Sequence, residues 1–164
     1  MTAKLKKIAS LISSVELNDV RLVESSVKTV IRSPKDAGDV DITFKAGAKV
    51  DAPPTAGVFY VLATAEMNIA LRQTKVSAVS VRAAYELKYH LPGKLKTNAK
   101  DLNKFAQVNG IFNAWPFFRE FIQNSFERMH LPSMTLPVYR LGNPPFASST
   151  SPNVSPKSQT GSKG

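Results

Sequence analysis

The chain of 164 residues contains no cysteine and only two histidines, and each scarcity removes a class of function. Without cysteine there are no disulfides, thiolate nucleophiles or thiolate metal sites, and nothing requires an oxidising compartment. No apolar run reaches the roughly 18 residues of a membrane span, and segment 1–14 lacks the continuous apolar core of a signal peptide. We therefore expect a cytoplasmic protein whose length suits one domain with its own core.

Groups that commonly carry catalysis are equally scarce. His90 and His130 each lie beside a Leu-Pro pair, and neither has a second metal ligand at helical spacing. The sequence has no glycine-rich phosphate loop and no nucleophile elbow, and Glu120 and Glu127 are two helical turns apart. We expect no enzymatic activity, no metal and no cofactor.

Acidic residues are scarcer than basic ones. The chain has 12 acidic and 22 basic residues, which gives a formal net charge of +10. Such an excess raises the possibility of a nucleic-acid ligand, but the basic residues are spread along the chain. The densest run is Lys94, Lys96, Lys100 and Lys104, and a solvated turn and helix face explain it equally well. A basic, oligomeric nucleic-acid-binding protein stays the alternative to the function that the motifs suggest.

The first half of the chain shows alternation of apolar and polar residues. This pattern over 59–71 and 79–89, around the polar turn 72–75, predicts a long antiparallel hairpin with one apolar face. Alternation at Val40, Ile42 and Phe44 predicts another strand, which we expect the Pro53-Pro54 pair to end by Asp51 or Ala52.

An earlier strand is less regular, because its apolar alternation slips by one residue near Leu22. Val20 and Leu22 are expected on one face, and Val23, Val27 and Ile31 on the other. The slip predicts a β-bulge or bend at this point.

Two helices are predicted after the strands. Asn98, with Asp101 three residues later, caps a short helix that carries Leu102, Phe105 and Ala106, and that Gly110 is expected to end. Asn113 then caps a longer helix, with Pro116 at a position where its missing N–H has no intrahelical acceptor.

The apolar residues of the longer helix span about 180°, against the roughly 100° stripe of an ordinary surface helix. One sheet cannot cover this width, so we predict that part of the surface contacts other copies of the chain. A core helix within a monomer is the alternative interpretation. The predicted oligomer interface consists of Trp115, Phe118, Phe121, Ile122 and Ser125.

The C-terminal third changes character after this helix. Pro132 and Pro137 bracket Met134 and Leu136, so this apolar arm must be extended. Residues 142–164 are rich in Pro, Ser, Gly and Lys, and are expected to form a disordered tail. We predict an amphipathic N-terminal arm at 1–14 and one domain at 15–141, with an α+β fold in which a four-stranded antiparallel sheet packs with a long C-terminal helix.

Two motifs carry a resemblance to the SecB family of protein-export chaperones. Asn113-Ala114-Trp115-Pro116-Phe117-Phe118-Arg119-Glu120 resembles the family's long helix, and Leu131-Pro132-Ser133-Met134-Thr135-Leu136 is similar to its Phe-Pro-x-Leu-x-Leu segment. The strand Val40-Asp41-Ile42-Thr43-Phe44 looks like the family's Val-x-Leu-x-Leu. The resemblance runs in order from about Val15 to Tyr139 and is strongest in its last third.

The resemblance implies an ATP-independent holdase, a chaperone that binds unfolded polypeptides in apolar grooves of a homotetramer built as a dimer of dimers. Each large apolar side chain buried against such a client contributes about 1.5–3 kcal/mol, so several contacts suffice. Alternating strand residues and a proline-braced arm are also ordinary core in most proteins, and this alternative stays open. The residues implied to line the groove are Val40, Ile42, Phe44, Leu131, Met134 and Leu136.

Three features of the chain depart from the family. Typical members are acidic and deliver clients to the SecA motor, so a SecA contact is an open prediction for this basic chain. They close the groove with a second C-terminal helix, where this chain continues into a Pro- and Ser-rich tail. The predicted N-terminal helix is similar to that of SecB-like chaperones associated with toxin-antitoxin systems, so a dedicated antitoxin competes with preproteins as the client.

Overall fold

The computed structural model of the chain describes residues 3–33, 38–93 and 97–140. Its elements follow the predicted α+β order, and the predicted tail at 142–164 lies outside the described residues. In chain order the elements are α1 (Ala3–Ser14), β1 (Glu16–Thr29), β2 (Val40–Thr55), β3 (Val58–Leu71), β4 (Ser77–His90), α2 (Ala99–Phe105), η2 (Ala106–Gly110) and α3 (Ile111–Arg128).

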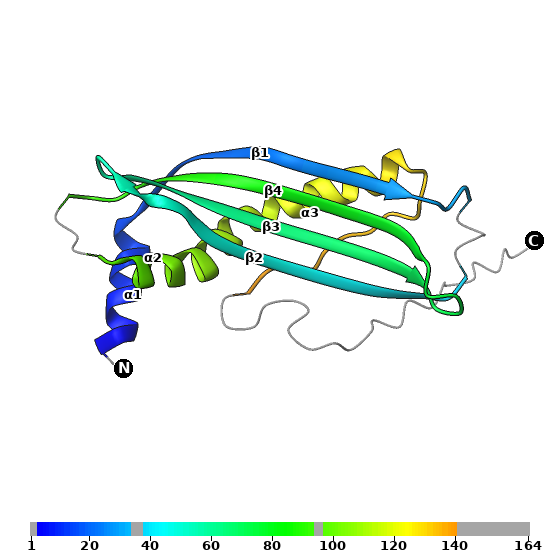
Figure 1. Cartoon of the computed structure of the whole chain (residues 1–164), viewed down its shortest axis with the longest axis horizontal. Helices are drawn as coiled ribbons and strands as arrows, with labels where there is room; N and C mark the ends of the chain where they lie inside the picture. The colour runs from blue at the N-terminus through cyan, green and yellow to red at the C-terminus, as the bar shows by residue number, and fades with distance from the viewer. Residues whose placement is uncertain (1–2, 34–37, 94–96, 141–164) are drawn as a thin grey trace, which may run out of the picture.

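The four strands form one antiparallel sheet in the order β1-β4-β3-β2. The helix α3 runs behind the sheet, and α1 stands beside α2 at one end (Figure 1). The predicted hairpin is confirmed, since β3 pairs with β4 and alternate residues from Phe59 to Ile69 and from Val79 to Tyr89 are buried. The predicted α+β architecture is therefore confirmed.

Aromatic side chains fill the core between the sheet and the helices. Phe59 stacks on Tyr89 at a ring distance of 5.3 Å, and Phe105 meets both rings edge-on at 5.8 and 5.1 Å. The Tyr89 hydroxyl accepts a hydrogen bond from Asn113 Nδ2 at 2.9 Å. Burial raises the pKa of Tyr89 to about 12, so the phenol stays neutral in this core.

The prolines do not end β2 where we expected, because the strand continues through both of them to Thr55. Its pairing with β3 shifts register between Val50 and Ala52 and again between Ala52 and Thr55. β2 also lies at the edge of the described sheet. Proline is tolerated at an edge or a bulge, since no partner strand needs its missing N–H there.

The predicted irregularity in β1 is confirmed by a register shift between Leu22 and Glu24. A second shift lies between Leu17 and Asp19. Leu22 and Val27 pair with Tyr85 and Val81, which both face the helices, so our expectation of opposite faces was wrong. The inserted residue restores the phase of the alternation.

The two predicted helices are one continuous helical segment. Asn98 caps α2 as predicted, because its side chain accepts from the Asp101 N–H at 2.9 Å. Gly110 does not end the helix, since the π-helical turn η2 leads directly into α3. Asn113 and Pro116 consequently lie inside α3, and Asn113 bonds Tyr89 rather than capping a helix.

Replacing Gly110 by alanine is expected to lower the free energy of unfolding by about 1–2 kcal/mol. A Cβ there would lie 2.8 Å from Val61 Cγ1 and 3.3 Å from Ala48 Cβ. Overpacking of about 1–3 kcal/mol therefore exceeds the gain of up to about 1 kcal/mol from helix propensity. Urea unfolding measures the change, with Gly47→Ala as the control because its Cβ meets no atom within 4 Å. Equal loss in both variants contradicts the tight contact at Gly110.

Candidate functional site

The segment that follows α3 is an extended arm held against the helix. Trp115 Nε1 donates to the Pro137 carbonyl at 2.8 Å, and Arg119 Nε donates to the Leu136 carbonyl at 2.9 Å. Leu136 is buried, at 1% exposure. The two side-chain donors take up carbonyls that an extended, proline-containing segment cannot satisfy within itself. Arg119, although charged, is thus part of the attachment of the arm.

The inner face of β2 lies beside this arm. Val40, Ile42 and Phe44 are partly buried and pack against the core. The Phe44 ring meets Trp115 edge-on at 5.5 Å, and Trp115 lies 5.2 Å from the ring of Tyr139 at the end of the arm. The edge strand, the helix and the arm thus share one set of aromatic contacts.

The six residues predicted to line a groove are distributed between the surface and the core. Leu131 and Met134 are partly buried like the three residues of β2, and only Leu136 is fully buried. Leu136 therefore belongs to the attachment of the arm, and the other five leave part of their apolar surface accessible. Their role in binding a client stays a prediction.

Most residues of the predicted oligomer interface lie in the core of the chain itself. Trp115, Phe118, Ile122 and Ser125 are buried in the single chain, and Phe121 is partly buried. The apolar arc of α3 is wide because the sheet covers one side of it and the arm another. The Ser125 hydroxyl donates to the Phe121 carbonyl at 2.7 Å, within the helix. An interface with another copy stays a prediction, with Phe121 as the member of this set that keeps accessible surface.

The sequence patterns did not identify a second apolar surface on β1 and α3. Both Phe112 and Phe117 are exposed on α3, at 39% and 37%. A bulge interrupts the alternation of apolar and polar residues along a strand, so the sequence pattern of β1 did not show which of its apolar residues are exposed. The exposed apolar residues of β1 and the segment just after it are Leu17, Leu22, Val23, Val27 and Val30.

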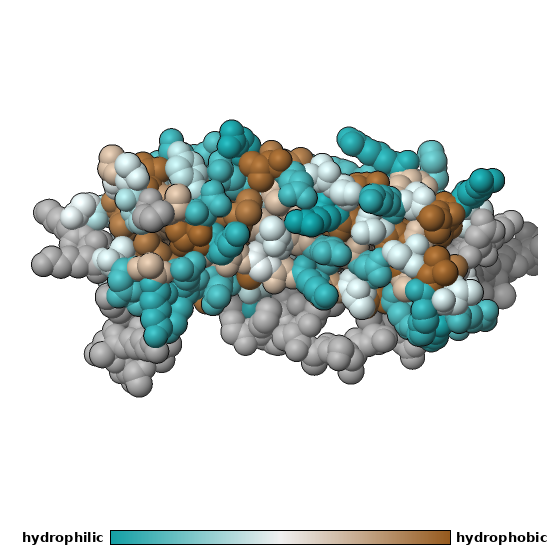
Figure 2. All heavy atoms as spheres, viewed as in Figure 1, coloured by the Kyte–Doolittle hydropathy of each residue, from teal (hydrophilic) through white to brown (hydrophobic). Residues whose placement is uncertain are grey.

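The face of the sheet turned away from α3 carries charges of both signs. Figure 2 shows hydrophilic and hydrophobic residues interleaved on this face. Arg21 pairs with Glu86 at 2.7 Å across β1 and β4. At one end, hydrogen bonds from Lys75 and Arg72 lower the pKa of Asp41. Such exposed pairs contribute little to stability, but among the described residues they bring opposite charges side by side on this face.

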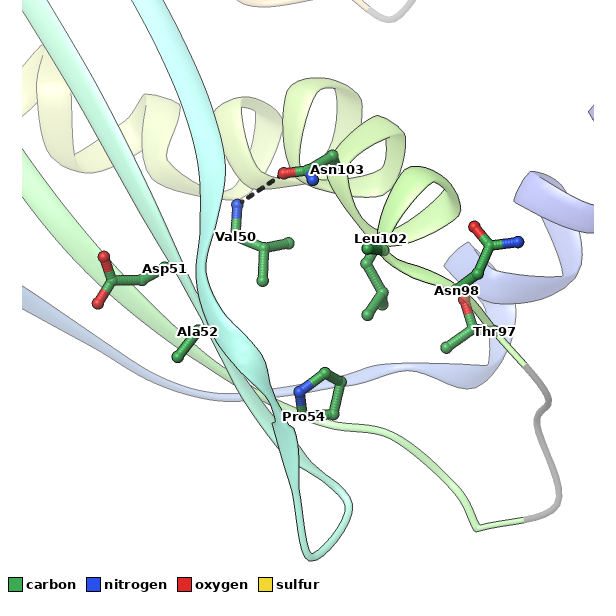
Figure 3. A pocket seen from close by; sticks show the side chains of 9 residues that line it. Val50, Asp51, Ala52, Pro54, Thr97, Asn98, Leu102 and Asn103 are labelled. Carbon is green, nitrogen blue, oxygen red and sulfur yellow. Dashed lines mark hydrogen bonds between the residues drawn. The ribbon is translucent and has the colours of Figure 1, made fainter.

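A hollow lies between the end of β2 and the start of α2 (Figure 3). Its volume is about 280 Å³, and Val50, Pro54 and Leu102 line it among others. Val50 N–H donates across the gap to Asn103 Oδ1 at 3.2 Å, which ties the two elements together. Within residues 3–33, 38–93 and 97–140, no group of three acidic or histidine side chains is placed to hold a metal ion.

Comparison with known proteins identifies the fold. No protein-family profile and no curated protein matches the chain. Its structure is similar to that of a SecB-like chaperone of Mycobacterium tuberculosis in complex with a ChAD peptide from the HigA1 antitoxin, with a TM-score of 0.72 and 22% identity, covering 82% of this chain and 97% of that one. A protein of unknown function from Streptococcus agalactiae aligns with a TM-score of 0.47 and 12% identity, over 75% and 96% of the two chains. The first of these shows that the fold is SecB-like, as the motifs predicted.

Proposed function

We propose that this chain is a chaperone that holds unfolded polypeptides without ATP. The observation that carries the proposal is the row of partly buried apolar residues on β2, at the edge of a SecB-like sheet and beside an apolar arm. A holder of unfolded chains needs apolar surface that stays accessible, since its clients share hydrophobicity rather than a sequence. The similar chaperone of Mycobacterium tuberculosis was solved with a peptide bound.

Two kinds of client are considered for this chain: many different unfolded preproteins, or one dedicated antitoxin. The antitoxin peptide in the similar structure favours the second. Within the described residues, charges of both signs alternate on the outer face of the sheet, where the SecB family presents acidic surface to SecA, so holding is proposed to be independent of SecA. A pull-down of bound polypeptides in the presence and absence of SecA separates these alternatives.

We further propose that the holding form is a cytoplasmic homotetramer, a dimer of dimers, whose copies meet through the exposed row of β1 and through Phe112, Phe117 and Phe121 of α3. These residues leave apolar surface uncovered in the single chain. Exposed apolar residues of this kind are typical of a contact between subunits. The described residues contain no helix long and apolar enough to cross a membrane.

Salt dependence separates this function from nucleic-acid binding. Suppression of the aggregation of a refolding model protein is expected to persist from low to high salt, because apolar burial is not weakened by salt. Binding to phosphates falls steeply with salt, because counterion release is undone. Light scattering of the refolding protein and fluorescence anisotropy of labelled DNA and RNA measure the two activities. If the chain fails to hold the protein and binds nucleic acid with a steep salt dependence, the basic nucleic-acid binder replaces the chaperone.

A further inference from the structure

The arm that follows α3 is attached to the helix at two points one helical turn apart. Arg119 Nε donates to the Leu136 carbonyl at 2.9 Å, and Trp115 Nε1 donates to the Pro137 carbonyl at 2.8 Å. Trp115 and Arg119 are four residues apart and so lie on the same face of α3. The later helix residue bonds the earlier arm residue, so the arm runs back antiparallel to α3 (Figure 1).

Few other contacts fix the position of the arm. Residues 131–139 form neither helix nor strand, so no hydrogen-bonded ladder holds them. Leu136 is the one fully buried side chain among them, at 1% exposure. Tyr139 adds a ring contact with Trp115 at 5.2 Å. The attachment therefore depends chiefly on one buried side chain, one ring and the two donors of α3.

The two donors differ in what else they do. Trp115 is 3% exposed, and its ring belongs to the core, where it also meets Phe44 edge-on at 5.5 Å. Arg119 is only partly buried, and its Nε bonds a neutral carbonyl of the arm. A hydrogen bond from a charged donor shifts an equilibrium by about tenfold or more. Arg119 therefore contributes to the docking of the arm and little to the core of the chain.

The docked arm carries one side of the predicted client groove. Leu131 and Met134 of the arm and Ile42 of β2 are partly buried and pack against the same core. A client that contacts both sides gains fully from each only if the two sides are already in place, since ordering a loose segment on binding costs affinity. An arm that is fixed beforehand therefore raises the affinity without adding a contact.

We propose that Arg119 is a positioning residue of the client groove: its bond to the Leu136 carbonyl fixes the arm against α3 and raises client affinity, although Arg119 itself does not touch the client. The proposal rests on the proposed chaperone function and adds the residue that keeps one wall of the groove in place. The bond goes to the backbone, so it fixes where the arm lies without using any side chain that the arm presents to a client.

Replacing Arg119 by methionine tests this bond, because methionine is a long side chain of similar helix propensity but has no donor. The Kd for a permanently unfolded model protein is expected to rise about tenfold. Arg119→Lys restores a charged donor and is expected to bind the client at least about threefold more tightly than Arg119→Met. Arg128→Met is the matched control, because Arg128 is exposed in the last turn of α3, and its Kd is expected to stay within about twofold of wild type.

The fluorescence of Trp115 reports on the arm directly, because Trp115 is the only tryptophan of the chain and bonds the arm. Quenching by acrylamide is expected to increase in Arg119→Met and to stay unchanged in Arg128→Met, since release of the arm uncovers the ring. The melting temperature, measured by circular dichroism, is expected to fall by less than about 5 °C, because the core residues are unchanged. Loss of the fold in Arg119→Met assigns Arg119 to the core and overturns the proposal.

A double-mutant cycle shows whether Arg119 acts through the arm or on the client. Leu136→Ala removes the buried side chain of the arm and is expected to weaken client binding by about tenfold or more on its own. If Arg119 acts through the arm, adding Arg119→Met to Leu136→Ala weakens binding by less than about a further twofold, because the arm is already released. If the two losses multiply, Arg119 contacts the client directly and the proposal is overturned.

The wild-type chain separates failure of this inference from failure of the chaperone function. If the wild type holds the unfolded protein and Arg119→Met holds it equally well or more tightly, the positioning role is wrong and the chaperone function stands. If the wild type does not hold the unfolded protein, the chaperone function and this inference both fail.

Discussion

Phe118→Ala is expected to lower the free energy of unfolding by about 3–5 kcal/mol, a large part of the stability of a domain this size. Phe118 is completely buried and meets Tyr85 edge-on at a ring distance of 5.2 Å. Removing a ring at such a position leaves a cavity that the surrounding sheet and helix cannot close. The melting temperature is expected to fall by about 10 °C or more. Calorimetry and urea unfolding measure both quantities.

The neighbouring residue provides the control. Phe117 is 37% exposed in the single chain, although its ring lies 5.7 Å from Tyr85. At protein concentrations where the protomers are dissociated, Phe117→Ala is therefore expected to cost about 1 kcal/mol or less. Protein concentration then separates core from interface. If Phe118 serves the core, Phe118→Ala lowers the free energy of unfolding by the same amount at every protein concentration. If this loss shrinks as the concentration rises, and the wild-type protein dissociates into protomers at low concentration, Phe118 lies in a contact between copies.

Changing Ile42 and Met134 together to asparagine is expected to weaken the holding of an unfolded client by about 10- to 100-fold. Both residues are partly buried in the free chain, one on β2 and the other on the arm. Full burial of each side chain is worth about 1.5–3 kcal/mol, and roughly half of this remains to be gained from a client. The two together give about 1.5–3 kcal/mol, which corresponds to the expected loss of affinity. Titration against a permanently unfolded model protein measures it.

Thr43→Asn is the matched control for this pair. Thr43 lies between Ile42 and Phe44 but is exposed on the other face of β2. The substitution Thr43→Asn introduces the same amide group one residue away from Ile42 without changing the surface toward the arm. The affinity for the unfolded client is therefore expected to stay within about twofold of that of the wild type. If the double variant unfolds, Ile42 and Met134 serve the core. If it folds and holds its client as well as the control, the two residues do not bind the client. Either outcome contradicts the groove prediction.

The local sequence patterns predicted those elements that depend on neighbouring residues. The alternation in 59–71 and 79–89 predicted the central hairpin, and Asn98 predicted its cap. The same reasoning failed at Gly110 and at the Pro53-Pro54 pair. Both residues usually interrupt an element, but here Gly110 packs against Val61 and the prolines occupy a bulged edge. Position in the fold decided these two outcomes.

The sequence by itself determined the one-sided sheet, the extended arm and the motifs of a SecB-like fold, because alternation, proline geometry and motif spacing are local properties. Only the tertiary structure decided which side of the broad apolar arc on α3 is internal. It covers Phe118 and Ile122 within the chain and leaves Phe117 exposed. It also decided that β2 is regular from Val40 to Val50 and irregular only near its prolines, whereas β1 shifts register at two places within the strand. Burial and edge position depend on what packs against a residue from distant parts of the chain, and no local pattern contains that information.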